Sequence, residues 1–201
     1  MIRPAQKSDA LGIAILHQRT LTNSFLAKLG LRFLESLCIF LIKKEIVIVY
    51  TEENTVKGFV SFTPNSSDMM KRFLFFCPAC LLKLPNILIT NPVFLKELIE
   101  TFFAPFKSKT SLSTTTKVLL PDAELLSISV DQTCHHAGIG SQLLAALENR
   151  LKQKGIPKYK VIAGTSLDGA NKFYLRKNFI FVSQIIIHNN ELSNIYTRTL
   201  I

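Results

Sequence analysis

The sequence lacks several features that would assign it to a membrane or secreted class. No charge-free apolar run reaches the ~18 residues that a membrane span requires. Charges fall within the first nine residues, before a helical pattern begins, so the N-terminus is not interpreted as a secretory signal. Four cysteines in 201 residues do not form a disulfide framework. These absences lead us to expect a cytoplasmic protein.

The chain also lacks the basic runs that are typical of nucleic-acid binding. Its net charge is +10 and its pI about 9.6, but the lysines are scattered and do not alternate with aromatic residues. We therefore expect no nucleic-acid partner, and we interpret the charge as support for an anionic ligand. A hydrophobic fraction of 48% in 201 residues predicts one globular domain, 1–201.

A metal site is not expected either. Cys77 and Cys80 form a CxxC, which can be half of a zinc site or a redox pair, but no second CxxC accompanies it. We interpret the two cysteines as buried thiols in an apolar helical turn. His17 is a single histidine on a predicted helix and is interpreted as structural.

The most informative stretch runs from residue 125 to 151. Residues 125–130 are rich in aliphatic side chains and predict a buried strand, and the turn that follows contains Gly138 and Gly140. Leucines then recur at helical spacing up to Leu151. A strand followed by a glycine-rich turn and a helix exposes backbone N–H groups at the positive end of the helix dipole, which suits a phosphate or pyrophosphate.

Two common phosphate-binding motifs do not fit this turn. No Lys-Ser/Thr follows the glycines, as a P-loop requires. The third glycine of the dinucleotide fingerprint is missing, and so are the repeated strand-helix-strand units. The alternative without a ligand is a turn in which glycine only relieves crowding.

The run from His135 to Gly140 resembles motif A of the GNAT acyl-CoA N-acyltransferases, Arg/Gln-x-x-Gly-x-Gly/Ala, which follows a strand ending in Val, here Val130. His135 stands where the family usually has Arg or Gln. The resemblance implies that backbone amides of the turn hold the coenzyme A pyrophosphate, and that those of the strand hold the pantetheine and the thioester oxygen. The implied cofactor-binding residues here are Ile128, Ser129, Val130, His135, His136, Ala137, Gly138, Ile139, Gly140 and Ser141.

Residues 170–179 resemble motif B of the same family, with matches at Ala170, Phe173, Tyr174 and Phe179. The family's Asn and Gly positions hold Leu167 and Asn178 instead. Asn can still adopt the left-handed conformation that glycine supplies at a helix end. Asn171 and Tyr174 complete the cofactor-binding set that the resemblance implies.

The resemblance also implies two catalytic residues. Tyr174 corresponds to the tyrosine that protonates the thiolate leaving group in the family; the alternative is a half-buried core tyrosine. Glu124 resembles the glutamate base of the histone-acetylating branch, and burial would raise the pKa of its carboxyl toward that of a useful base. The alternative for Glu124 is a solvated residue at a strand end.

The chain order is also that of a GNAT domain: a short strand at 2–5, two helices and a hairpin over 46–63. We therefore predict an α/β (α+β mixed sheet) GNAT fold. Residues 66–118 depart from it and are predicted to form a helical insertion, cut into short helices by prolines. This insertion is interpreted as a lid over the acceptor, with a dimer contact or core scaffolding as alternatives. Its excess of basic residues favours an anionic acceptor.

These patterns together predict an N-acetyltransferase that moves an acetyl group from acetyl-CoA, its co-substrate, directly to a primary amine of a small molecule. A protein or peptide N-acetyltransferase and a non-catalytic acyl-CoA-binding module are the alternatives. Membrane contact through 66–118 is a third alternative. The sequence leaves the oligomeric state open, and a homodimer is compatible with it.

Overall fold

The protein is described from a computed structural model that places residues 1–21, 25–83, 119–134, 137–187 and 191–200. Its centre is a mixed seven-stranded sheet with the strand order β1-β2-β3-β4-β5-β7-β6. The strands are β1 (Ile2–Pro4), β2 (Ile46–Glu52), β3 (Thr55–Thr63), β4 (Glu124–Val130), β5 (Lys158–Gly164), β6 (Ile180–Ile187) and β7 (Glu191–Thr199). The pairing of β4 with β5 is parallel, and the other pairs are antiparallel. The predicted mixed α/β sheet is confirmed.

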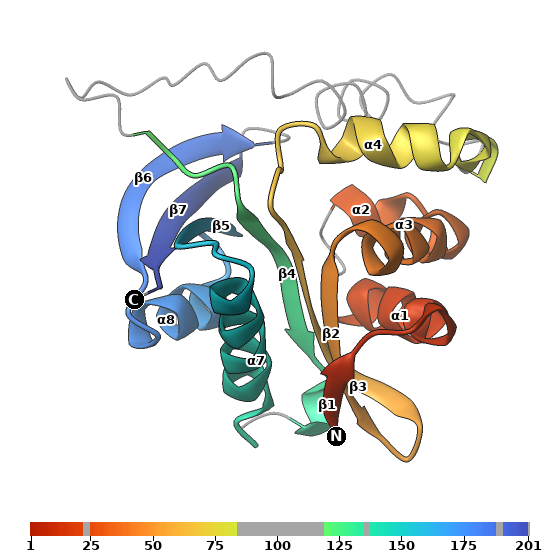
Figure 1. Cartoon of the computed structure of the whole chain (residues 1–201), viewed down its shortest axis with the longest axis horizontal. Helices are drawn as coiled ribbons and strands as arrows, with labels where there is room; N and C mark the ends of the chain where they lie inside the picture. Colours follow the sequence, from red (N-terminus) through yellow and green to blue (C-terminus); the bar gives the residue numbers. More distant parts are fainter. Residues whose placement is uncertain (22–24, 84–118, 135–136, 188–190, 201) are drawn as a thin grey trace.

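Helices cover both faces of the sheet (Figure 1). They are α1 (Ala10–Thr20), α2 (Phe25–Lys28), α3 (Leu31–Lys44), α4 (Met69–Phe76), α7 (Ile139–Gln153) and α8 (Asp168–Arg176). Short 3-10 segments lie at η1 (Lys7–Asp9), η2 (Pro78–Lys83) and η4 (Gln132–Cys134). Gly30, with φ 86°, separates α2 from α3 because this left-handed backbone conformation is open to glycine. No helix in the described part of the chain is long and apolar enough to cross a membrane.

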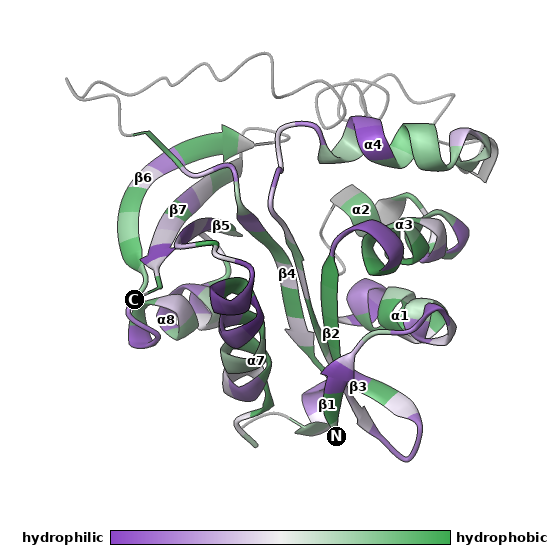
Figure 2. Cartoon of the chain, viewed as in Figure 1, coloured by the Kyte–Doolittle hydropathy of each residue, from purple (hydrophilic) through white to green (hydrophobic). Residues whose placement is uncertain are grey.

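The sheet separates two hydrophobic cores. One lies under α1 and α3 and includes Phe33, Phe40 and Phe59, and the other lies under α7 and includes Leu143 and Leu147. Strand β2 contributes to both cores, and it is mainly hydrophobic in Figure 2. Burial on both faces explains why its sequence is a nearly continuous apolar run.

The described part of the predicted insertion packs on the first core. Phe73 of α4 is fully buried, with ring centroids 5.4 Å from Phe33 and 5.6 Å from Phe40. Arg72 anchors the same helix through an ion pair with the buried Glu45. Helix α4 therefore packs on the first core, and the role of 66–118 as a lid, a dimer contact or scaffolding stays a prediction. Residues 84–118, with most of the insertion, lie outside the described residues.

The interpretation of Cys77 and Cys80 as two buried thiols needs correction. The structure joins them in a disulfide across the end of α4 and the start of η2. Cys80 is fully buried and Cys77 half-buried, and the chain turn brings their Cα atoms to 5.4 Å. Such a Cα separation lies within the range that a disulfide spans. The free cysteines among the described residues are Cys38 and Cys134.

Candidate active site

Strands β4 and β5 are paired only at one end. Their register contains Glu124 with Lys160 and Leu125 with Val161, and no later residue of β4 pairs with β5 in the described structure. Strand β3 stays paired with β4 as far as Val130. The two parallel strands therefore form a fork that opens after Leu125. Within the fork, the peptide groups of β4 that point away from β3 are not paired with β5 in the described structure, which suits this side of β4 to binding a ligand.

A β-bulge lies at the same point of β4. The register to β3 shifts between Ser61, which pairs with Ser127, and Phe62, which pairs with Leu125, so Leu126 has no Cα partner in β3. A bulge bends its strand and increases the local twist. The fork and the bulge together explain how β4 turns away from β5 after only two pairs.

Helix α7 begins where the predicted glycine turn ends. Gly138 precedes the helix with φ 74° and ψ 5°, a left-handed conformation that is unfavourable for most other residues, and no side chain among the described residues caps the helix. Its carbonyl accepts the first helical hydrogen bond, from the Gln142 amide at 3.0 Å. The amides of Ile139, Gly140 and Ser141 belong to the first turn, where helix geometry supplies no partner. These amides and the helix dipole make the start of α7 suited to an anion.

Several of the predicted cofactor contacts surround this helix start. Ala137 and Gly138 are exposed, while Gly140 and Ser141 are half-buried. The side chain of Ile139 is buried in the α7 core, so only its backbone can face a ligand. His135 and His136 lie outside the described residues.

The two sequence motifs meet at Gly140. A Cβ atom at this position would stand 3.7 Å from Cε2 of Phe173 on α8 and 3.8 Å from Cγ2 of Val130 at the end of β4. The end of β4, the start of α7 and the middle of α8 therefore meet at Gly140. The sequence resemblance placed these residues in separate motifs, and the fold brings them into contact.

Close packing of α7 on the sheet depends on a glycine that the sequence analysis missed. A Cβ atom on Gly58 of β3 would lie 3.1 Å from Cδ1 of Leu143, 3.3 Å from Cγ2 of Ile139 and 3.3 Å from the carbonyl oxygen of Ser129. All three neighbours would have to move to admit a side chain. Gly58 thus allows the start of α7 to pack closely on β3.

Tyr174 lies in a cluster of aromatic rings on the α7 side of the sheet. Its ring centroid is 5.2 Å from that of Phe179, 5.5 Å from Phe173 and 5.9 Å from Tyr196. The side chain is buried, and burial raises the pKa of the Tyr174 hydroxyl above its ordinary value. The hydroxyl therefore keeps its proton near neutral pH and can serve as a proton donor.

Asn171 is engaged by internal hydrogen bonds. Its Nδ2 donates to the carbonyl oxygens of Gly164 and Leu167, each at 2.9 Å. Its Oδ1 accepts from Nδ2 of Asn194 at 2.9 Å and from the Tyr196 hydroxyl at 2.8 Å. These contacts use both donors and the acceptor of the amide, so the side chain ties α8 to β5 and β7. Contact between Asn171 and a cofactor stays a prediction.

Glu124 lies at the closed end of the fork, apart from the tyrosine cluster. Its Oε2 is 3.4 Å from Nζ of Lys160, which also donates to the Pro121 carbonyl at 2.8 Å and to the Ser66 hydroxyl at 3.0 Å. Burial raises the pKa of the Glu124 carboxyl, and the Lys160 charge opposes that rise. Lys160 was not found from the sequence because it belongs to a different strand and no local pattern links it to Glu124.

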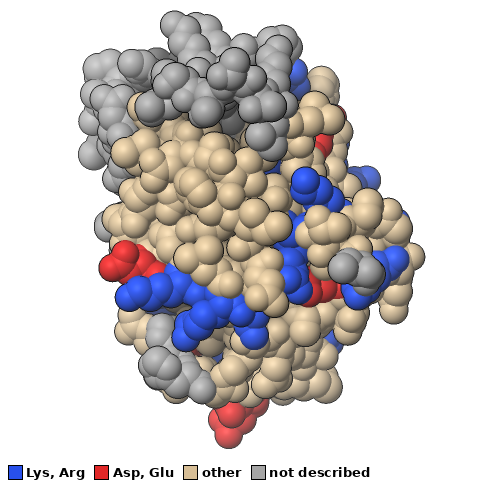
Figure 3. Space-filling model, turned by 90° about the vertical axis from the view of Figure 1, so that its left-hand side faces the viewer, with Lys and Arg blue, Asp and Glu red and all other residues tan. Residues whose placement is uncertain are grey.

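Cations gather on the side of the molecule where β6 and α8 lie. Figure 3 shows Lys and Arg across the lower part of this face, below a wide area without charged residues. Exposed apolar residues of that face include Ile180 and Ile186 on the edge strand β6. Among the described residues, no group of three His, Cys, Asp or Glu is placed to hold a metal ion.

Comparisons with known proteins agree with this arrangement. Residues 114–179 match the family model of the acetyltransferase (GNAT) family. The fold is similar to that of an N-acetyltransferase from Staphylococcus aureus Mu50, with a TM-score of 0.65 and 20% identity over 98% of this chain and 100% of that one. It is also similar to a ribosomal-protein-alanine N-acetyltransferase from Brucella melitensis, with a TM-score of 0.61 and 15% identity over 100% and 99%.

A third similar structure is that of yncA from Salmonella typhimurium, solved with its cofactor acetyl-CoA. The TM-score is 0.54 and the identity 14%, over 100% of this chain and 94% of that one. No curated protein matches this chain in sequence. The predicted GNAT fold is confirmed by these structural similarities.

Proposed function

We propose that this chain, whose residues 114–179 match the family model of the acetyltransferase (GNAT) family, transfers an acetyl group from acetyl-CoA to a primary amine of a small molecule. The fork between β4 and β5, which opens after Leu125 and leads to the uncapped start of α7, is the observation that carries the proposal. A cytoplasmic location is part of the proposal and rests on the sequence alone.

The described residues fit coenzyme A along this path. The start of α7 offers amides of Ile139, Gly140 and Ser141 and a positive dipole for the pyrophosphate. Strand β4 offers the peptide groups of Ile128 inside the fork for the pantetheine amides and the thioester oxygen, whereas those of Ser129 point toward β3, on the same side as the Asp131 amide that donates to Lys57. Each of these interactions uses the backbone, so the fit does not depend on the departures of motifs A and B from the family pattern.

The proposed reaction requires two proton movements. The amine nitrogen attacks the thioester carbonyl carbon, a C–N bond forms, and the C–S bond then breaks to release the coenzyme A thiolate. Glu124 would take the proton that the amine must lose, directly or through water, and its raised pKa improves it as a base. Tyr174, which is protonated near neutral pH, would give a proton to the thiolate.

The insertion supports a covered acceptor site. Met69, on α4, belongs to the insertion and lines a cavity whose wall also contains Leu126 and Ser127 of β4. The described start of the insertion therefore shares a cavity wall with β4, on the face opposite α7. This position favours a small acceptor over an extended polypeptide. A protein or peptide N-acetyltransferase remains the second candidate, since the Brucella protein with the same fold is a ribosomal-protein-alanine N-acetyltransferase.

Thiol release from acetyl-CoA, measured with a panel of small amines and a panel of peptides with free N-termini, tests the proposal. We expect turnover with members of the amine panel above the rate of acetyl-CoA hydrolysis. Turnover confined to peptides would support the second candidate. Binding of acetyl-CoA without transfer to either panel would favour a non-catalytic acyl-CoA-binding module.

A further inference from the structure

A cavity of about 120 Å³ lies on the α1 and α3 side of the sheet, next to the fork. Its wall comes from α1, α2, α3 and α4 and from strands β2, β3 and β4. Strand β4 contributes Leu126, the bulge residue, and Ser127, which directly follow the last pair between β4 and β5. The cavity therefore adjoins the proposed reaction site but lies on the face opposite α7.

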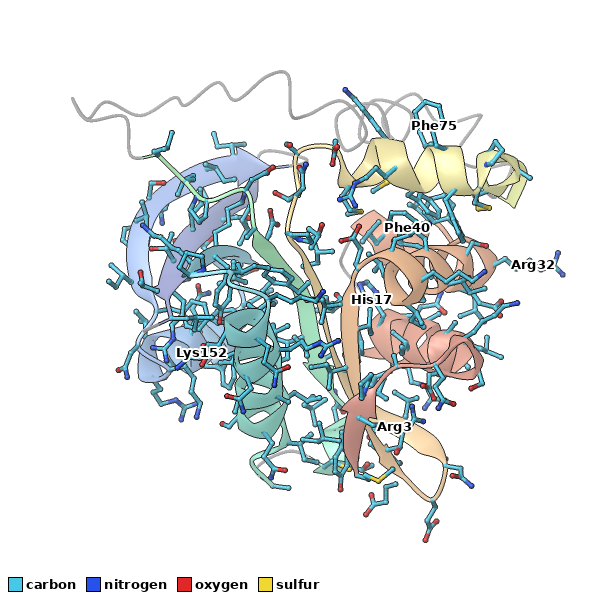
Figure 4. All side chains as sticks on the ribbon, in the orientation of Figure 1. Arg3, His17, Arg32, Phe40, Phe75 and Lys152 are labelled. Atoms are coloured by element: carbon cyan, nitrogen blue, oxygen red, sulfur yellow. A yellow bond between two sulfur atoms is a disulfide. The ribbon has the colours of Figure 1, made fainter. Side chains whose placement is uncertain are left out.

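The chemistry of the cavity wall is specific. The described residues that line it include no Asp, Glu, Lys or Arg, and the lining is apolar apart from His17, Ser61 and Ser127. His17 extends from α1 toward the sheet (Figure 4), and its ring stacks on Phe59 of β3 with centroids 6.2 Å apart. Burial lowers the pKa of His17 to about 4, so its imidazole is neutral near pH 7.

Two polar atoms of this wall lack hydrogen-bond partners. They are Nδ1 of His17 and the Ser127 hydroxyl, and both are buried in the described structure. Only 7% of the His17 surface is exposed. A buried polar atom without a partner is costly, and buried sites in folded proteins are usually satisfied. A ligand that offers a hydrogen-bonding group here would remove that cost.

We infer that this cavity binds the end of the acceptor amine remote from the reacting nitrogen, and that this end is apolar with one uncharged hydrogen-bonding group such as a hydroxyl or amide. The inference rests on the proposed function and adds the chemical class of the acceptor. An apolar cavity of similar size, about 150 Å³, accommodates benzene, so about five or six non-hydrogen atoms fit here. A plain alkyl acyl chain is a poorer occupant, because it would leave both polar atoms unpaired.

The inference differs from the expectation of an anionic acceptor. That expectation came from the excess of basic residues in 66–118, most of which lies outside the described residues. The described residues of the cavity wall offer no cation to a carboxylate or phosphate, and transfer of a charge into such surroundings is strongly unfavourable. The charge of the insertion and the chemistry of the cavity therefore make opposite predictions, which one series of amines can separate.

The test uses four linear primary amines of similar length that differ at the remote end: aminopentanol, hexylamine, cadaverine and aminovalerate. Calorimetry with the full chain and saturating coenzyme A measures their binding, and thiol release from acetyl-CoA measures their turnover. We expect aminopentanol to bind about tenfold more tightly than hexylamine, the scale of one satisfied hydrogen bond. We expect the two amines with charged ends to bind about a hundredfold less tightly than aminopentanol.

Variants assign the effect to the cavity. Ser127→Ala and His17→Phe should each reduce the preference for aminopentanol over hexylamine, while hexylamine binding stays within about twofold. Ser36→Ala is the matched control, because its buried hydroxyl on α3 donates to the Arg32 carbonyl at 2.9 Å and does not line the cavity. The control should retain the full preference.

The outcomes separate this inference from the proposed function. Aminopentanol binding with the expected preference but no acetyl transfer would contradict the function and leave the cavity assignment standing. Turnover with equal preference for all four amines, or with a preference for a charged end, would overturn the inference. Use of hexanoyl-CoA at the rate of acetyl-CoA, lost in Cys38→Leu, would assign the cavity to the acyl chain and overturn it as well.

Discussion

Leu125 and Val161 form the last pair between the parallel strands β4 and β5. Beyond them β4 bulges at Leu126 and leaves β5, and the space between the strands leads to the start of α7. In a continuous parallel sheet, neighbouring strands would bond these peptide groups to one another. In the fork, the backbone of β4 beyond Leu125 is not paired with β5 in the described structure. The proposed binding of acetyl-CoA depends on this end of the β4–β5 pairing.

If Tyr174 is the general acid, Tyr174→Phe should lower kcat by ~10²-fold, the usual scale of such help. The KM for acetyl-CoA should change little, because the ring keeps its contacts with Phe173 and Phe179. Tyr159→Phe is the control: it also removes a buried hydroxyl, one bonded to Glu148 at 2.9 Å. Steady-state kinetics of both variants measure the effect. An equal loss of kcat in both would indicate that Tyr174 has only a structural role.

The pH profile of kcat/KM tests Glu124. A base works when deprotonated, so activity should fall as the pH drops through the pKa of Glu124, which burial raises above its ordinary value. Glu124→Gln should remove this acidic limb. Lys160→Met should move the limb to higher pH, because the charge that opposes the rise is gone. The exposed Lys158 on the same strand supplies the control, Lys158→Met, whose limb should stay in place.

Gly58 and Gly169 should respond to alanine in opposite ways. Gly58→Ala forces a Cβ against Leu143 and Ile139 and should cost on the order of 1–3 kcal/mol of unfolding free energy. Gly169 lies in α8, and a Cβ atom at this position would have no described neighbour within 4 Å outside its own helix. Gly169→Ala should therefore leave the free energy of unfolding unchanged or raise it by up to about 1 kcal/mol. Urea denaturation of both variants checks the contrast. Equal stability would mean that α7 can move away from β3 without cost.

His17 should weaken the fold in mild acid. Its pKa is about 4 in the folded protein because of burial and about 6.5 when unfolded, so the unfolded state binds a proton first as the pH falls. Protonation of His17 leaves the free energy of unfolding unchanged above about pH 6.5 and lowers it progressively between pH 6.5 and pH 4. Relative to His17→Phe, the wild type should lose up to about 3 kcal/mol over this range. Parallel acid-unfolding curves for the two proteins would contradict a buried, neutral His17.

The sequence predicted the elements that follow from local patterns. The strand at 125–130, the glycine turn and the leucine spacing gave β4, the start of α7 and its buried face. Asn178 adopts the predicted left-handed conformation, with φ 59°. In each of these cases the physical cause lies within a few residues of the effect.

Long-range relationships were not predicted. The pairing of Glu124 with Lys160 and the approach of Gly58 to Leu143 join residues that no local periodicity connects. The cavity was missed for the same reason: His17 and Ser127 come from α1 and β4, more than a hundred positions apart in the sequence. His17 was interpreted as structural from the sequence. That its Nδ1 is buried without a partner depends on the packing of α1 on the sheet, which the sequence does not show.

The central claim is that coenzyme A binds where the fork meets the start of α7, and titration of acetyl-CoA into Gly140 variants tests it most directly. Gly140 is the better position, because substitution of Gly138 would also strain its left-handed backbone. A Cβ at Gly140 makes ordinary contacts of 3.7–3.9 Å with Phe173 and Val130, so Gly140→Ala should fold and bind normally. The larger Gly140→Val should weaken binding by at least about tenfold with little change in Tm, because its methyl groups crowd the amides that face the pyrophosphate. Wild-type affinity in a folded Gly140→Val protein would contradict the account.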